Sequence, residues 1–214
     1  PFVEPLTVLH QWQGICYYKK KITITPEEAK KHIWIEFEGA MHLADVWING
    51  KHVMQHAGGY TPFVVDATGL LKTDKENELL VRLDNRNNSL IPPGKPLETL
   101  DFCYYGGIYR NVHLIAKADV HITHPILDGH PAGAGIFITY PKVSQELSVV
   151  DAKTEIKNTS DKEKVVELRH TLYTWERQKG KDKKVQNISE TLTLHPGVTI
   201  ENNQRMEVKH PALW

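Results

Sequence analysis

The sequence predicts an all-β protein, a jelly-roll β-sandwich followed by an immunoglobulin-like β-sandwich. Apolar and polar residues alternate at period two, the mark of a half-buried strand, along most of the 214-residue chain. Gly, Pro, Asn and Asp separate the alternating segments at short intervals, which favours antiparallel sheets over a parallel sheet with crossover helices. No segment shows a convincing helical period over three turns.

The first part of the chain carries the clearest local signal. Asn49-Gly50 lies between two alternating segments, and both residues tolerate the positive φ of a type I′ turn, so a hairpin is expected over Ala44–Gln55. Trp47, just before the turn, is expected in the core. The other strands predicted in this part cover residues 16–24, 32–40, 78–86 and 110–116.

A domain boundary is expected near Lys117–Val120, where aromatic-rich and Gly-rich sequence gives way to long Lys/Glu-flanked strands. This divides the chain into domains 1–118 and 119–214. The lysines around 179–184 are interpreted as a solvated hairpin tip rather than a basic binding patch. Six strands are expected in the second domain, at 119–126, 135–143, 147–158, 164–175, 186–194 and 198–208.

The last residues, Leu213 and Trp214, are large and apolar, and we expect them to pack against something further on. The chain is therefore interpreted as a fragment whose second sandwich is one or two strands short. An open strand edge would then pair with another copy, so a homo-oligomer is among the expected states.

Composition excludes several partners. Lys+Arg and Asp+Glu number 26 each, so nothing favours nucleic acid or an anionic membrane. No apolar run approaches the roughly 20 residues of a membrane span. Cys16 and Cys103 allow at most one disulfide, which is not expected, and they leave the compartment open, with a periplasmic or secreted location slightly favoured over the cytoplasm.

Two glycine pairs stand before short aromatic motifs. Gly58-Gly59 precedes Tyr-Thr-Pro-Phe, and Gly106-Gly107 precedes Ile-Tyr-Arg110; each pair is expected to permit a sharp chain reversal. Together with Asp45-Val-Trp-Ile-Asn-Gly50, these motifs resemble the N-terminal sugar-binding domain of glycoside hydrolase family 2. That family contains β-galactosidases, β-glucuronidases and β-mannosidases.

The resemblance extends over essentially the whole chain. Gly14-Ile-Cys-Tyr-Tyr-Lys-Lys20 is similar to the family's first sandwich strand, and Pro211-Ala-Leu-Trp214 to a signature near the end of its immunoglobulin-like domain. The family's two catalytic glutamates lie on a later barrel, so the resemblance implies a chain without catalytic residues or a cofactor. The parent would be a retaining β-glycosidase, with β-galactosidase as the leading activity. The alternative is a stand-alone carbohydrate-binding module.

The resemblance also suggests where a carbohydrate substrate would be contacted. Asp101 matches a family Asp that holds the terminal sugar or an associated sodium ion; the other interpretation is an Asp that caps its loop. Tyr104 and Tyr105 would either stack on a sugar face or pack under the sandwich. Met41 stands where family β-galactosidases place an Asn, which leaves the sugar open. Arg110 is expected to pin its loop to carbonyls or a carboxylate.

Other candidate residues have simpler interpretations. The closest histidine pairs are His52/His56 and His121/His124. On a strand, residues four apart lie roughly 13 Å from each other and residues three apart lie on opposite faces, so neither pair forms the tight cluster that zinc needs and no metal is expected. Glu36 and Glu38 are read as a solvated edge rather than a catalytic pair. The segment Ile91–Pro96 is expected to run extended, either lining the pocket mouth or only connecting two strands. Three Asn-x-Ser sequons begin at Asn87, Asn158 and Asn187, and they predict glycans only if the protein is secreted by a eukaryote.

Overall fold

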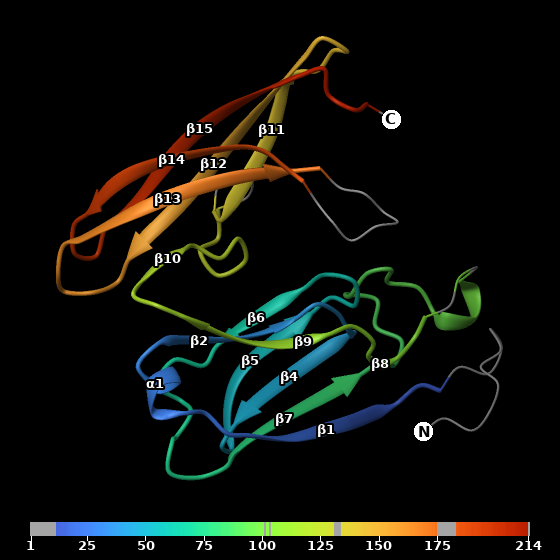
Figure 1. Ribbon diagram of the computed structural model, residues 1–214. Helices are drawn as coiled ribbons and strands as arrows, with labels where there is room; N and C mark the ends of the chain where they lie inside the picture. The colour runs from blue at the N-terminus through green and yellow to red at the C-terminus, as the bar shows by residue number, and fades with distance from the viewer. Residues whose placement is uncertain (1–11, 101, 103, 131–133, 175–182, 214) are drawn as a thin grey trace. The chain divides into compact units, whose positions relative to one another are not determined.

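The computed structural model describes residues 12–100, 102, 104–130, 134–174 and 183–213. The chain divides into two compact units, Pro1–Lys117 and Ala118–Trp214, one residue before the boundary expected from the sequence. Both units consist almost entirely of β-strands, as Figure 1 shows, so the all-β prediction is confirmed.

The first unit is a sandwich of two antiparallel sheets. One sheet has four strands in the order β1-β7-β4-β5, and the facing sheet has three in the order β6-β2-β9. Their interior faces pack on each other to form one core. Within the three-stranded sheet, the paired residues Phe37 and Phe63 stack their rings at 4.6 Å between centroids. The strands are β1 (Ile15–Ile22), β2 (His32–Phe37), β4 (Leu43–Ile48), β5 (Lys51–Ala57), β6 (Phe63–Asp66), β7 (Asn77–Asp84) and β9 (Val112–Lys117).

The expected hairpin joins β4 to β5. Asn49 and Gly50 have φ values of 52° and 81°, as a type I′ turn requires, and Ile48 pairs with Lys51 across the turn. Trp47 corrects the prediction of a core residue. Its neighbours Val46 and Ile48 point into the core, so period two turns Trp47 outward, where it is half-buried against the ring of His52 at 5.0 Å.

Among the residues that the structure describes, helical structure is confined to two short pieces. α1 (Pro26–Ala29) begins at a capping box, in which Thr25 and Glu28 bond reciprocally, and none of its residues is buried. η1 (Leu97–Thr99) is a single turn of 3-10 helix. A two-residue ladder, β3 (Ala40–Met41) with β8 (Gly107–Ile108), closes one end of the sandwich.

The second unit is organised around one long strand. β12 pairs with β15 along one edge, from Leu147↔Lys209 to Lys157↔Thr199. Along its other edge, β12 pairs with β11 over Val149–Thr154 and with β10 over Ile156–Asn158. β13 and β14 form a separate antiparallel hairpin, which packs Leu168 and Leu194 onto Ile156. The strands are β10 (Val120–Ile122), β11 (Ile136–Lys142), β12 (Leu147–Asn158), β13 (Lys164–Tyr173), β14 (Lys184–Leu194) and β15 (Thr199–Lys209).

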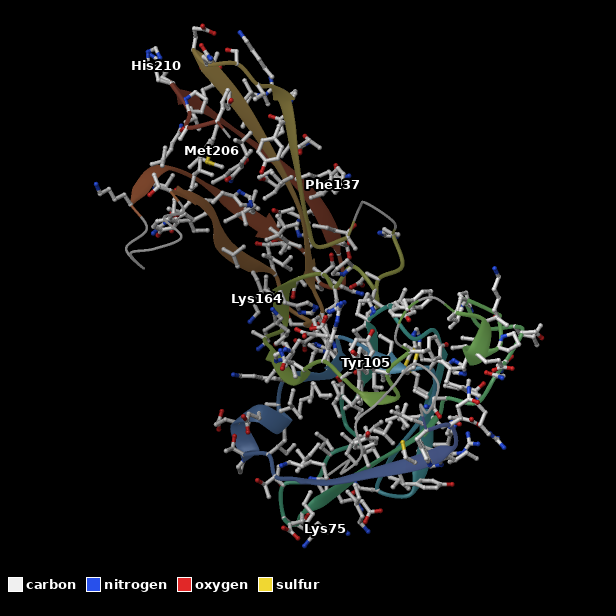
Figure 2. The ribbon with its side chains drawn as sticks, turned by 90° about the vertical axis from the view of Figure 1, so that its right-hand side faces the viewer. Lys75, Tyr105, Phe137, Lys164, Met206 and His210 are labelled. Atoms are coloured by element: carbon white, nitrogen blue, oxygen red, sulfur yellow. The ribbon has the colours of Figure 1, made fainter. Side chains whose placement is uncertain are left out.

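The six strands of the second unit coincide closely with the six expected from the sequence. Figure 2 shows their side chains, including Met206 of β15, which is buried, and Phe137 of β11, which is exposed. The Lys-rich segment joins β13 to β14, as expected for a hairpin, although Lys179 and Lys181 lie outside the described residues. The immunoglobulin-like assignment stays a prediction.

Two properties of the described residues bear on binding. None of the helices there has the length and apolar character needed to cross a bilayer. In the same part of the chain, no three His, Cys, Asp or Glu side chains gather closely enough to hold a metal ion. Cys16 is a free, half-buried thiol, whereas Cys103 lies outside the described residues.

Candidate functional site

The candidate site is the end of the first unit where β3 pairs with β8, which we call the rim. Both glycine-pair segments lead into it, since Gly58-Gly59 directly follows β5 and Gly107 begins β8. In β-sandwiches, loops at the ends of the sheets carry recognition because they are free of the packing that constrains the strands. The rim is therefore where a ligand contact is expected from the fold.

Close approach, rather than chain reversal, explains most of the glycines at the rim. Only Gly107, with φ of 88°, has a backbone conformation that favours glycine. A Cβ on Gly59 would collide with the Met41 side chain, and one on Gly106 would lie 2.5 Å from Asn85 Nδ2. The glycine pairs thus let neighbouring side chains pack directly on the backbone of the rim.

A small apolar cluster supports the rim from beneath. Met41, Leu97 and Tyr104 are buried together, with Tyr109 partly buried against them. The Tyr109 hydroxyl donates a 2.6 Å hydrogen bond to the Gly59 carbonyl. This bond ties the two glycine-pair segments together although 50 residues separate its partners.

Tyr104 forms a buried pair with His42. The Tyr104 hydroxyl lies 2.5 Å from His42 Nδ1, and the two rings meet edge to face. Burial lowers the pKa of His42 and raises the pKa of Tyr104 to about 12. Both groups are consequently neutral near pH 7, and they share one hydrogen bond between the phenol oxygen and Nδ1.

A shallow polar pocket of about 280 Å³ opens beside this pair, lined by His42, Leu43 and Asp84 together with Arg86, Asn87 and Asn88. Asp84 accepts hydrogen bonds from Arg86 Nε at 2.9 Å and Nη2 at 2.6 Å, and from Arg82 at 3.4 Å. The bonds from Arg86 are the main reason that the pKa of Asp84 is lowered. This carboxylate is therefore ionised and fully engaged by guanidinium groups.

Three aromatic side chains stand out from the rim. Tyr60 is 49% exposed, Phe102 is 43% exposed and Tyr105 is 55% exposed. Tyr60 also meets the buried Tyr104 edge to face, at 6.2 Å between ring centroids. Exposed aromatic faces are suited to stacking on the apolar C–H faces of sugars. Tyr60 and Phe102 were not among the predicted site residues, although each directly follows a motif residue, Gly59 and Asp101 respectively.

The structure places the predicted site residues unequally. Asp101 lies outside the described residues, so its role stays a prediction. Tyr104 is only 6% exposed, and its ring packs in the apolar cluster. This agrees with a tyrosine packed under the sandwich rather than one that stacks on a sugar. Arg110 is exposed; within the described chain its guanidinium lies over the Tyr109 ring at 5.6 Å instead of bonding a carbonyl or carboxylate.

The segment Ile91–Pro96 also differs from its expected extended path. The Gly94 N–H donates to the Ile91 carbonyl at 2.8 Å, which closes a tight turn, and Ile91 itself is buried. Gly94 has a φ of 71° and so accommodates the turn. Glu36 and Glu38 were expected on a solvated edge, but both side chains are half-buried. Glu38 Oε1 also lies 3.0 Å from His113 Nε2, within hydrogen-bond distance.

The fold and the rim together define a class: an all-β sandwich in which the loops of one end, rather than the sheets, present the aromatic and polar side chains. The chain belongs to glycosyl hydrolase family 2, because the model of that family's sugar-binding domain matches residues 4–118. The family resemblance of the motifs is thereby confirmed.

Individual relatives carry two different names. A β-glucuronidase of Bacteroides fragilis is 35% identical over 150 residues, 68% of this chain and 20% of that protein. A β-galactosidase of Bacteroides ovatus is 29% identical over 202 residues, 94% of this chain and 21% of that protein. The crystal structure of a Bacteroides uniformis β-glucuronidase superposes with a TM-score of 0.78 at 31% identity, over 95% of this chain and 23% of that one. The chain thus spans about a fifth of the length of these relatives.

Proposed function

We propose that the full-length protein hydrolyses terminal β-glycosidic bonds with retention, and that the first unit supplies one wall of its substrate pocket. Membership of family 2 is the observation that carries this proposal. Asp84 and Asp45 are each paired with an arginine, so neither carboxylate is available as an acid or base for catalysis. The exposed aromatics of the rim supply suitable sugar contacts.

The rim favours a β-glucuronide over a β-galactoside as substrate. Met41 is 1% exposed and occupies the position where β-galactosidases of the family are expected to carry an Asn that bonds a sugar hydroxyl. A buried thioether offers no such bond. Several relatives named β-glucuronidase support this choice, whereas relatives named β-galactosidase, one of them 35% identical, keep a galactoside as second candidate.

Hydrolysis of nitrophenyl β-glycosides by the full-length protein tests the proposal. We expect turnover of the β-glucuronide above that of the β-galactoside and the β-mannoside. Turnover led by the galactoside would replace the substrate but keep the reaction. No turnover of any β-glycoside in the panel would overturn the proposed function.

Asp101→Ala in the full-length protein tests whether the first unit supplies one wall of the substrate pocket. The loss of one charge-assisted contact to a sugar is expected to lower kcat/KM by about tenfold or more. Asp74→Ala is the matched control, since Asp74 is exposed in the loop before β7, and it is expected to leave kcat/KM unchanged. Equal kinetics for the two variants would remove Asp101 from the site.

A carbohydrate-binding module is a second candidate, because Tyr60, Phe102 and Tyr105 are exposed together near one end of a sandwich. Calorimetric titration of the 214-residue chain with glucuronate and galactose distinguishes it. Saturable binding by this chain, combined with an inactive full-length protein, would favour the module.

A further inference from the structure

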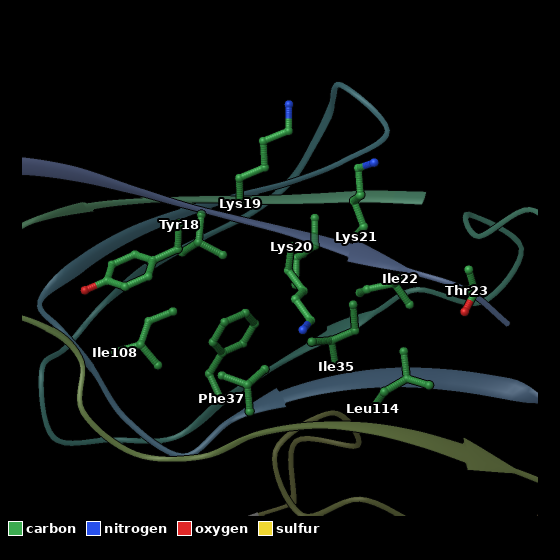
Figure 3. A pocket seen from close by; sticks show the side chains of 13 residues that line it. Tyr18, Lys19, Lys20, Lys21, Ile22, Thr23, Ile35, Phe37, Ile108 and Leu114 are labelled. Atoms are coloured by element: carbon green, nitrogen blue, oxygen red, sulfur yellow. The ribbon is translucent and has the colours of Figure 1, made fainter. Parts of the chain in front are cut away.

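An apolar groove of about 610 Å³ runs along the first unit between β1 and β9, away from the rim loops. β1 is the outermost strand of the four-stranded sheet, and β9 is the outermost strand of the three-stranded sheet. Figure 3 shows that the groove opens between these two edges and that Phe37 and Ile35 of β2 form its floor. The groove is therefore an opening into the interior of the sandwich.

The register of β1 shows which of its side chains face the groove. Tyr18 pairs with Val81 and Lys20 with Leu79, both of which are buried core residues of β7. Directly paired residues share a face, so Tyr18 and Lys20 point inward. Figure 3 shows Lys20 extending toward Phe37 and Ile35, whereas Lys19 and Lys21 extend the other way.

The register of β9 places apolar side chains on the opposite wall. Leu114 pairs with Ile35, and Val112 pairs with Phe37, so both point toward the interior. They nonetheless remain 39% and 40% exposed, while Ile35 and Phe37 are 1% and 0% exposed. Core-facing Leu and Val side chains left in contact with water are a loss of hydrophobic stabilisation that a covering element would recover.

The free edge of β9 determines the shape of that element. β9 pairs with β2 along one edge, and no strand in the described part of the chain pairs with the other. An edge of this kind presents unpaired backbone N–H and C=O groups to an added strand. One added strand would also give the three-stranded sheet the same number of strands as the sheet it faces.

We propose that the groove holds one further β-strand of the full-length protein, which pairs with the free edge of β9 and fills the opening in the sandwich. This strand presents alternate apolar side chains to Leu114, Val112 and Phe37. It also brings an oxygen acceptor to Lys20, because a covered ammonium group requires a hydrogen-bond partner.

A segment of the same polypeptide is favoured over a separate partner by the length of the relatives. The chain spans 20% of the Bacteroides fragilis β-glucuronidase and 23% of the Bacteroides uniformis structure, so matching proteins carry several hundred residues besides this portion. A segment attached to the same chain has a high effective concentration at the groove. The proposal is independent of the sugar specificity proposed above.

Thiol labelling tests the proposal. Leu114→Cys places a probe inside the groove, and His113→Cys, its exposed neighbour on the outer face of β9, is the matched control. Both variants carry Cys16→Ser and Cys103→Ser and are made in the full-length protein and in the 214-residue chain. We expect a maleimide to label Leu114→Cys at least about tenfold more slowly in the full-length protein than in the 214-residue chain, and His113→Cys equally in both.

Labelling at two protein concentrations about a hundredfold apart identifies the occupant. Protection confined to the full-length protein and independent of concentration supports the proposal. Equal labelling of Leu114→Cys in both chains would overturn it. Protection that increases with concentration in either chain would instead assign the groove to a second copy, which also overturns it. If Leu114→Cys does not fold, Val112→Cys probes the same wall.

Discussion

At the scale of single residues, the rim depends on polar groups that are buried and fully bonded. Asp84 ends β7, has a side chain only 10% exposed and is held by two arginines. His42 and Tyr104 satisfy each other in the same region. Because hydrogen-bond partners offset much of the cost of burying a polar group, these contacts can hold the loop conformations of the rim.

Replacement of Asp84 by Asn tests this arrangement through the pH dependence of stability. The folded-state pKa of Asp84 is lowered, so its contribution is complete above the unfolded pKa of about 3.9 and is lost as pH falls through the lower folded pKa. We expect Asp84→Asn to lower the free energy of unfolding by about 1.5–3 kcal/mol at pH 7. The difference from wild type should shrink below about pH 4, as measured by urea unfolding.

Asp151→Asn is the matched control for that experiment. Asp151 also bonds an arginine, Arg205 Nε at 2.6 Å, but its side chain is 27% exposed against 10% for Asp84, so water screens the pair more. Its effect at pH 7 should be clearly smaller than that of Asp84→Asn. A pH-independent difference for Asp84→Asn would show that its charge does not matter.

Residue patterns anticipated the rim only in part. The glycine pairs predicted which segments meet at the rim, because the effect of a glycine on its own backbone depends on no distant neighbour. Tyr104 and Arg110 carry no such mark, since an aromatic ring or a guanidinium group takes its role from neighbours that are distant in sequence. The burial of Tyr104 beside His42, 62 residues away, is a tertiary fact.

At the scale of elements, strand alternation and turn chemistry were sufficient to locate nearly all strands. Asn49-Gly50 fixed its hairpin because few other dipeptides tolerate two successive positive φ values. The sequon at Asn158 shows the limit of local motifs. This Asn is 0% exposed, and it donates to the carbonyls of Lys162, Leu194 and His195. These three hydrogen bonds, which we call the Asn158 clasp, join the end of β12 to the end of β14 and to the turn after β12.

Loss of the Asn158 clasp is expected to destabilise the second unit. Asn158→Ala leaves buried carbonyls at the end of β14 without a donor, so we expect the free energy of unfolding to fall by about 2–3 kcal/mol. Asn187→Ala, at an exposed sequon position on β14, should cost less than about 0.5 kcal/mol. Thermal and urea unfolding of the two variants would measure the difference, and equal stabilities would contradict the clasp.

At the scale of the whole molecule, both units leave core-facing apolar side chains exposed. In the second unit, Ile136 and Ile138 of β11 pair with the buried Thr154 and Ala152 and so face inward, yet they are 51% and 49% exposed. The open apolar face of β11 in the second unit favours association between copies.

We therefore expect the 214-residue chain to self-associate at micromolar to millimolar concentrations, the range in which species with exposed apolar surface and unpaired strand edges associate. Sedimentation velocity should detect the associated species. Ile138→Lys should weaken association, whereas Thr139→Lys, on the outer face of the same strand, should not. A wild-type chain that stays monomeric throughout this range would refute the expectation.

Local sequence patterns were sufficient to predict the fold class, most strands along the chain, the Asn49-Gly50 hairpin and the family. These features depend on period-two alternation, turn residues and short motifs, all of which act between residues close together in the chain. The tertiary structure alone decided that Trp47 faces outward, that Tyr104 is buried with His42 and that a groove lies open between β1 and β9. Each of these depends on which strands become neighbours across the sandwich, and such long-range pairings leave no local pattern in the sequence.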